Sequence, residues 1–288
     1  MANLSVPQIS LNDGAVLPQV GFGVFQVPAE DTAAVVADAL AAGYRSIDTA
    51  ARYGNEGGVG QAIASSGLSR EDVVVATKLA NPDQGYDSTL AAFDASAKAL
   101  GLDVVDLYLI HWPAPAREEF VNSWRAMEEL QAAGRIRSIG VSNFLPHHLE
   151  QLLEATGVVP AVNQIEVHPY LQQAELRAFN ASHGVITEAY SPLGRSTVLA
   201  DPVITGIAER IGRSPAQVVL RWHLQLGNVV IPKSVTPARM AENIDVLGFD
   251  LSADDMAAIA TLERGARTGF HPDHFNGFPE DFTGAPTP

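Results

Sequence analysis

The feature that most constrains this chain is a regular alternation of short apolar runs with segments of helical spacing. Eight runs rich in Val, Ile and Leu recur, namely PQVGFG, YRSIDT, DVVVATK, VVDLYLIHW, IRSIGVSN, AVNQIEV, GVITEAYS and NVVIPKS. Their apolar character is nearly continuous, which is typical of parallel strands buried on both faces. Eight alternations of strand and helix predict an α/β fold, a (β/α)8 TIM barrel.

The intervening segments carry helix start and stop signals. TAAVVADALAAG places its apolar side chains on one face and ends at Gly43. SPAQVVLRWHLQLG begins with Ser214 as N-cap and Pro215 in the first turn, and it ends at Gly227. A doubly wound open sheet is the competing architecture, but no GxGxxG turn follows the first strand.

Additional elements are expected at both ends of the barrel. QISLNDGAVLPQ alternates around Asp13-Gly14, which predicts a β-hairpin that plugs the bottom of the barrel. TPARMAENIDVL and SADDMAAIATLE follow the eighth strand as two further helices. The tail, residues 264–288, is rich in Gly, Pro and aromatic residues, so it is either an extended flap near the active site or a frayed terminus. We expect residues 1–288 to form a single domain.

Composition excludes several function classes. The net charge of −15 and the pI of 4.8 disfavour nucleic acid and anionic membrane partners. The absence of cysteine excludes disulfides, thiolate metal sites and a cysteine nucleophile. No secretory signal and no run of about 18 apolar residues is evident. We therefore expect a soluble cytoplasmic protein, and nothing in the sequence requires more than a monomer.

Polar residues end seven of the eight runs, where barrel enzymes build their sites. In chain order they are Asp48, Lys78, His111, Ser142 with Asn143, Gln164 with Glu166, Tyr190 with Ser191, and Lys233 with Ser234. The loop after the second strand adds Tyr53. Each type has a structural alternative, because an Asp can cap a helix, a Tyr can pack and a His can lie in the core. A lysine ending the run VVVAT needs a partner, and Asp48 on the neighbouring strand is the natural one.

Convergence of these residues would favour one kind of chemistry. Tyr53 has an ordinary pKa of about 10, which a nearby Lys78 ammonium would lower. Asp48 would hold Lys78, and His111 could hydrogen-bond a substrate oxygen. The set suits protonation of a carbonyl oxygen while hydride reaches its carbon, and it includes no nucleophile and no metal site.

The hydride must then come from a cofactor. Lys233, Ser234 and Arg239 gather two cations and a hydroxyl near the start of a helix, which favours anions. The alternative is an ordinary capped surface helix.

With these residues assembled, the chain resembles the aldo-keto reductase family over nearly its whole length. The motifs GFGVF, GYRSIDTAARYGNE, TKL, DLYLIHWP, IGVSNF, VNQIEVHP, SPLG and IPKSVTPARMAEN occur in the family's order and spacing. Among subgroups it is most similar to the short bacterial members that include 2,5-diketo-D-gluconate reductases. The resemblance implies a barrel enzyme that uses NADPH/NADP+ to reduce small-molecule aldehydes and ketones reversibly, without metal.

The resemblance also implies site residues. The catalytic tetrad would be Tyr53 as proton donor, Lys78 with Asp48 as its activating pair, and His111 as the group that orients the carbonyl. Cofactor contacts would fall on Gly23, Val24, Ser142, Asn143, Gln164, Tyr190, Ser191, Leu193, Lys233, Ser234, Val235, Arg239, Glu242 and Asn243. In this set, Ser142, Asn143 and Gln164 would bind the nicotinamide carboxamide, and Tyr190 would stack on its ring. Lys233, Ser234 and Arg239 would bind the adenosine 2′-phosphate, which predicts a preference for NADPH over NADH.

The expected substrate pocket departs from the family pattern. Phe22, Trp112 and the tail residues Phe270, Phe275 and Phe278 are expected to line it together with His111. Ala80 replaces the Trp found in many members, and the loop RSTVLADP after SPLG is short.

Two other functions are conceivable for such a chain. A Schiff-base aldolase would use Lys78 as its nucleophile. A regulatory subunit of a membrane channel would bind the cofactor with little turnover, although the intact tetrad disfavours that function.

Overall fold

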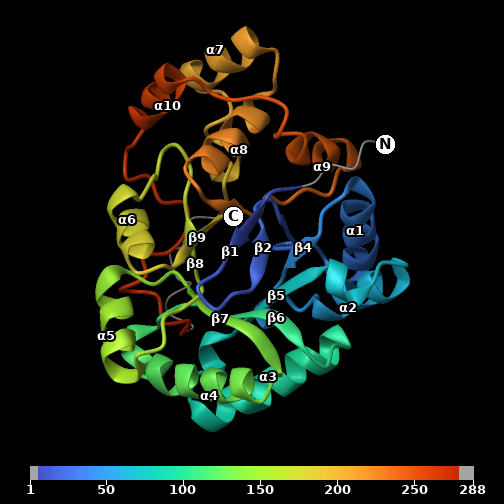
Figure 1. Ribbon diagram of the computed structural model, residues 1–288, viewed down its shortest axis with the longest axis vertical. Coiled ribbons are helices and arrows are strands. Elements are labelled where there is room, and N and C mark those ends of the chain that lie inside the picture. Colours follow the sequence, from blue (N-terminus) through green and yellow to red (C-terminus); the bar gives the residue numbers. More distant parts are fainter. Residues whose placement is uncertain (1–5, 279–288) are drawn as a thin grey trace.

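A closed parallel barrel forms the centre of the molecule, as Figure 1 shows for this computed structural model, which describes residues 6–278. Eight strands are hydrogen-bonded in the order β10-β9-β8-β7-β6-β5-β4-β3. They are β3 (Phe22–Gly23), β4 (Ser46–Asp48), β5 (Val74–Leu79), β6 (Val105–Ile110), β7 (Ile136–Ser142), β8 (Val162–Glu166), β9 (Ile186–Tyr190) and β10 (Val229–Val230). A parallel bridge between Val20 and Val230 closes the circle. The predicted (β/α)8 fold is confirmed.

Helices surround this barrel (Figure 1). They are α1 (Ala29–Ala42), α2 (Glu56–Ser65), α3 (Tyr86–Leu100), α4 (Phe120–Ala132), α5 (Pro146–Thr156), α6 (Ala174–Ser182), α7 (Pro202–Ile211), α8 (Pro215–Gln225), α9 (Pro237–Ile244) and α10 (Ala253–Ala260). Helix α7 precedes α8 between β9 and β10, and it is an addition that the sequence analysis did not assign. No helix in the described range is long and apolar enough to cross a membrane.

The strands are apolar on both faces because the barrel has two cores. In β6, Leu107 and Leu109 point into the barrel interior, where they pack with Ala76 and Val162. The alternate residue Tyr108 points outward into the larger core between strands and helices. The pleat therefore explains the near-continuous apolar runs.

Local capping signals act as expected from the sequence. Gly43 ends α1 with a φ of 108°, a conformation that side chains rarely adopt. Ser214 caps α8 and forms a capping box with Gln217. These signals fix where the helices start and stop, and thus where the loops at the barrel mouth begin.

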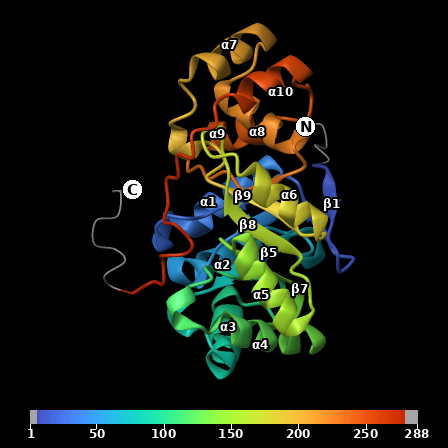
Figure 2. The same cartoon turned by 90° about the vertical axis from the view of Figure 1, so that its left-hand side faces the viewer.

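The predicted N-terminal hairpin covers the bottom of the barrel. Strands β1 (Gln8–Ser10) and β2 (Val16–Pro18) pair antiparallel. Leu11 and Leu17 pack against the inward-facing Ala76 and Leu107. Figure 2 shows this hairpin on the opposite side of the molecule from the C-terminal segment.

The C-terminal segment, residues 264–278, runs without helix or strand across the other end of the barrel (Figure 2). Its start is tied to the loop after β8, because Tyr170 O accepts from the amides of Arg264 and Ala266. The described part of the tail is therefore extended and fixed at its start, while residues 279–288 of the predicted tail lie outside the described residues.

Candidate active site

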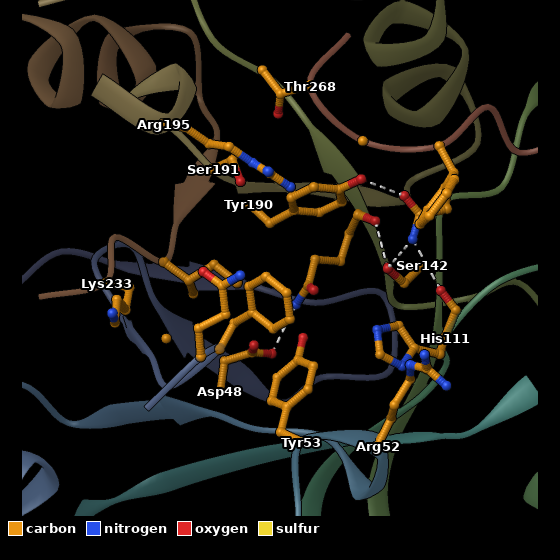
Figure 3. A pocket seen from close by; sticks show the side chains of 18 of the residues that line it. Asp48, Arg52, Tyr53, His111, Ser142, Tyr190, Ser191, Arg195, Lys233 and Thr268 are labelled. Atoms are coloured by element: carbon orange, nitrogen blue, oxygen red, sulfur yellow. Dashed lines mark hydrogen bonds between the residues drawn. The ribbon is translucent and has the colours of Figure 1, made fainter. Parts of the chain in front are cut away.

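A cavity of about 570 Å³ opens at the carboxyl ends of the strands (Figure 3). Many of the residues selected from the sequence line it, namely Gly23, Asp48, Tyr53, His111, Trp112, Ser142, Asn143, Gln164, Tyr190, Ser191, Leu193 and Lys233. They come from nearly every strand of the barrel, as expected for a site built at strand ends.

A buried ion pair lies at the base of the cavity. Lys78 Nζ donates to both carboxylate oxygens of Asp48 at 2.7 Å and to Thr49 O at 2.9 Å. The Lys78 side chain is 0% exposed. Burial alone would lower the pKa of Lys78, but Asp48 and Tyr53 outweigh it, and the pKa is raised. Lys78 is therefore a fixed positive charge beneath the cavity.

Tyr53 lies above this pair, at the end of the helical turn Ala51–Tyr53 that follows β4. The Lys78 ammonium is 5.3 Å from the centre of the Tyr53 ring. Burial raises the pKa of the phenol, whereas Lys78 lowers it, and the net direction is upward. The predicted lowering of the pKa by Lys78 is present, but desolvation of the hydroxyl and the charge of Asp48 outweigh it, which the sequence-based expectation omitted.

His111 faces Tyr53 from the end of β6. The two ring centres are 5.7 Å apart in an edge-to-face arrangement. Burial lowers the pKa of His111 well below its usual value, and the cations Lys78 and Arg52 lower it further. His111 is therefore a neutral imidazole at pH 7, with one N–H to donate. Its Nδ1 atom is buried without a hydrogen-bond partner.

A second group of polar side chains lies on the neighbouring strands. Tyr190 Oη donates to Asn143 Oδ1 at 2.8 Å, and Asn143 Nδ2 donates to His111 O at 3.0 Å. Ser142 Oγ donates to Gln164 O at 2.9 Å. These bonds fix the wall that adjoins the tetrad.

Glu188 is a buried carboxyl that the sequence analysis missed. It lies on β9 with 1% of its surface exposed. Gln164 Nε2 donates both to Glu188 Oε2 at 2.7 Å and to Asp48 Oδ2 at 2.8 Å. Burial and the nearby Asp48 raise the pKa of Glu188 to about 7, although Gln164 and Lys78 oppose this shift. The only available signal was a charged residue inside the apolar run GVITEAYS.

The C-terminal segment forms one wall of the cavity. Glu166 Oε1 accepts from the amide and hydroxyl of Thr268, each at 2.6 Å. Phe270 and Phe275 stack on each other, with ring centres 4.2 Å apart, and both contact Trp112. Glu166 therefore anchors the C-terminal segment. The aromatic side chains of this segment enclose the space near His111.

A second tie holds this segment to the start of α5. Asp273 Oδ1 lies 3.0 Å from His147 Nε2 and 3.4 Å from His148 Nε2. His148 Nδ1 accepts from the amide of Leu145, so its proton is on Nε2. The close approach of Asp273 to the two imidazoles forms a clasp between the two segments.

The side of the cavity after β9 is cationic. Arg195 and Lys233 line it, and Figure 3 shows both across the cavity from Arg52. Ser191, Arg195 and Ser196 have φ angles of 46°, 51° and 69°, in the left-handed region that non-glycine residues rarely adopt. Such strain is concentrated where a loop must follow a fixed path around a ligand.

Some residues selected from the sequence lie elsewhere. Phe22 does not line the cavity, because its side chain points out of the barrel and packs edge-to-face on Tyr44 at 5.2 Å. Phe278 packs under the Arg117 guanidinium, 4.6 Å from its ring centre, and is also outside the cavity. Successive residues of β3 face opposite sides of the sheet, so Gly23 and not Phe22 lies at the mouth of the cavity.

The remaining cofactor candidates lie beyond the cavity wall. Val24 is buried in the outer core. Ser234, Val235, Arg239, Glu242 and Asn243 are on the loop before α9 and on that helix, and none lines the cavity. Of these, Arg239 and Val235 are exposed, whereas Asn243 is buried and Glu242 accepts from Ser214 Oγ.

The cavity also includes residues that were not selected from the sequence. They are Phe25, Gln26, Arg52, Asn81, Pro192, Arg195, Ser196, Ile231, Pro232, Thr268, Gly269 and Gly277. Most lie in loops after the strands, whose paths a strand-end rule does not give. Asn81 replaces Ala80 as the wall residue after β5, and its buried Nδ2 has no hydrogen-bond partner.

Comparisons with known proteins agree with the motifs. A model of the aldo/keto reductase family matches residues 19–264. An aldo-keto reductase of Mycolicibacterium smegmatis is 62% identical over 270 residues, which cover 94% of this chain and 98% of the relative. The methylglyoxal reductase DkgA of Escherichia coli K12 is 50% identical over 279 residues, covering 96% and 100%. A solved mutant of Gox0644 in complex with NADPH has a TM-score of 0.91 and 51% identity, covering 94% and 99%.

Proposed function

Because the chain belongs to the aldo/keto reductase family, we propose that it reduces aldehydes and ketones to alcohols, reversibly, with NADPH. One observation carries the proposal. The phenol of Tyr53 lies beside the buried Asp48–Lys78 pair, in a cavity that also exposes a neutral His111. A proton donor, a fixed cation and a neutral hydrogen-bond donor are what a carbonyl oxygen needs as it becomes an alkoxide.

Tyr53 donates the proton in this proposal. Burial keeps its pKa high, so the phenol is protonated at neutral pH. After transfer, the phenolate lies next to the Lys78 ammonium, which stabilises the negative charge. Asp48 accepts from Lys78 through both oxygens and so keeps the ammonium in place.

His111 orients the carbonyl. Its lowered pKa keeps the imidazole neutral, so it donates a hydrogen bond without acting as a second acid. The carbonyl oxygen then accepts from both Tyr53 and His111, which fixes the face that receives hydride.

The opposite side of the cavity fits a dinucleotide. When bound, NADPH supplies the hydride. Arg195 and Lys233 offer positive charge to phosphates within a chain of net charge −15. Both donated hydrogens of Gln164 Nε2 are used inside the barrel, which leaves its Oε1 for an amide N–H of the nicotinamide. We assign Lys233, Ser234 and Arg239, just before and at the start of α9, to the 2′-phosphate.

We expect small aldehydes, α-dicarbonyls and keto sugars as substrates. Trp112, Phe270 and Phe275 supply apolar walls near Tyr53 and His111. The 50% identical relative named methylglyoxal reductase supports an α-dicarbonyl.

The test is an NADPH-consumption assay over aldehydes, α-dicarbonyls, keto sugars and cyclic ketones, run beside Tyr53→Phe. We expect the wild type to turn over at least one class and the variant to lose about 10²- to 10⁴-fold in kcat, the usual contribution of a general acid. NADPH binding to the variant should be unchanged, because the ring remains. A variant with near-wild-type kcat would show that Tyr53 is not the donor.

The aldolase alternative finds less support. Lys78 is fully buried, does not line the cavity and has Asp48 and Thr49 as partners, whereas a Schiff base needs an accessible neutral amine. Borohydride trapping of Lys78 with a carbonyl would reverse this choice. Tight NADPH binding without turnover on any substrate would instead favour the regulatory function.

A further inference from the structure

Glu188 is a buried carboxyl that the proposed reaction does not use. It lies on β9, two residues before Tyr190, and its exposed fraction is 1%. Its partner in the β8–β9 register is Gln164. A carboxyl costs free energy to bury, so its surroundings must compensate for it.

The compensation comes from the side-chain amide of Gln164. Its Nε2 donates one hydrogen to Glu188 at 2.7 Å and the other to Asp48 at 2.8 Å. Two carboxyl acceptors on one side require the NH₂ group there, so the orientation of the amide is fixed by the network. Its Oε1 is consequently the atom left for a ligand, and Gln164 lines the cavity.

We propose that Glu188 is a positioning residue that holds the Gln164 amide with its oxygen toward the nicotinamide carboxamide, and that its ionisation tunes the charge beneath the cofactor. This inference rests on the proposed function only in taking NADPH as the cofactor. Loss of the Glu188 acceptor leaves the Gln164 amide held by its single hydrogen bond to Asp48. The orientation of its oxygen toward the cavity is then less firmly fixed.

The effect of Glu188 ionisation on the charge beneath the cofactor follows from the groups that face this carboxyl. Asp48 and Lys78 are the charged groups among them, and they neutralise each other. An ionised Glu188 therefore adds one uncompensated negative charge below Gln164. The oxidised nicotinamide ring is positive and the reduced ring is neutral, so ionisation favours NADP+ over NADPH.

Two variants separate the positioning role of Glu188 from the effect of its charge. Glu188→Gln keeps an acceptor for Gln164 but cannot ionise, whereas Glu188→Leu removes both properties. Thr187→Val is the matched control, because Thr187 points outward on the same strand and accepts from Asn180. Dissociation constants for NADPH and NADP+ are measured without any carbonyl, from the quenching of protein fluorescence, at pH 6 and pH 8.

We expect Glu188→Leu to bind NADPH about fivefold more weakly, the loss typical of one neutral hydrogen bond, here the bond between Gln164 Oε1 and the carboxamide. Glu188→Gln should stay within about twofold of the wild type at pH 6. In the wild type, the preference for NADP+ over NADPH should increase from pH 6 to pH 8, and Glu188→Gln should abolish this change.

Three results would overturn the inference. They are unchanged NADPH affinity in Glu188→Leu, an equal loss in Thr187→Val, or a pH-dependent preference that survives in Glu188→Gln. If the Leu variant does not fold, as judged by circular dichroism, the pH comparison of Glu188→Gln with the wild type decides alone. Failure of the proposed function would look different, because the wild type would bind NADPH and reduce no carbonyl.

Discussion

The buried Asp48–Lys78 pair is better explained by a role in the reaction than by a contribution to the stability of the fold. Its two hydrogen bonds of 2.7 Å are fully desolvated, so attraction and the cost of burial are both large and offset each other. A purely structural role would be served as well by apolar residues of the same volume. Placing a permanent cation under the Tyr53 phenol is the property that apolar residues cannot supply.

Removing only one partner should be costly. We expect Lys78→Met to lower the free energy of unfolding by about 3–5 kcal/mol, because Asp48 is then buried without a counter-charge. The double variant Asp48→Asn/Lys78→Met should recover most of that stability while remaining inactive. Urea unfolding measures both, and a double variant no more stable than Lys78→Met would contradict the pairing argument.

For single residues, the sequence was enough to select polar side chains at the ends of strands, but not those within strands. Asp48, Lys78 and His111 could be selected because polar side chains interrupt apolar runs at a known rim. Glu188 lies one pleat below the rim, and a strand that alternates between two cores gives no local sign of which side a residue faces. Phe22 was assigned to the pocket for the same reason, because face is set by register and not by composition.

Among the elements, the C-terminal segment has the clearest effect on the pocket. It has no regular structure, and its position depends on Glu166, on the Asp273 clasp and on the contacts of Trp112 with its two phenylalanines. Composition left two alternatives for the tail, an extended aromatic flap or a frayed terminus. It could not predict the anchors, because they are tertiary contacts to β8 and α5.

Two phenylalanines of this segment form a matched pair for testing its role. Phe275 packs 4.7 Å from Trp112 in the cavity, whereas Phe278 packs on Arg117 outside it. We expect Phe275→Ala to raise KM for an aromatic aldehyde about tenfold, through lost apolar contact with the substrate, and Phe278→Ala to change it less than twofold. Steady-state kinetics at saturating NADPH provides the measurement. Equal effects from the two variants would place the substrate elsewhere.

The start of α9 determines the choice of cofactor in our proposal. Lys233 and Arg239 are both exposed there, before and within the first turn of a helix. Replacing both with neutral residues should raise KM for NADPH far more than for NADH, because only NADPH carries the 2′-phosphate. KM for each cofactor is compared at a fixed carbonyl concentration. An equal loss with both cofactors would remove these residues from phosphate recognition.

For the whole molecule, the alternation of strand and helix was enough to predict the barrel, because eight parallel strands buried on both faces have few other arrangements. Its closure was not predictable in detail. The sheet closes through the Val20–Val230 bridge and Gly23, where an added Cβ would lie 3.1 Å from Ile231 O. That close approach is a property of the assembled barrel, and no short segment encodes it alone.

Glu188 contributes one component of the pH dependence of the free energy of unfolding. The pKa of Glu188 is about 7 in the folded protein, compared with 4.5 for an exposed glutamate. Below pH 4.5 both states are protonated, and the carboxyl costs nothing extra. As pH rises toward 7, the unfolded chain releases this proton first, so stability falls, and above the folded pKa the loss is complete.

The comparison of Glu188→Gln with the wild type isolates this contribution, since glutamine cannot titrate. Relative to the wild type, the variant should gain stability from pH 5 to pH 8 by an amount on the order of 1–3 kcal/mol. Urea unfolding at several pH values gives the difference directly, and other ionisable groups cancel because both proteins share them. A difference that stays constant with pH would mean that Glu188 is ionised throughout, and the barrel interior would then hold a net negative charge that Lys78 must stabilise alone.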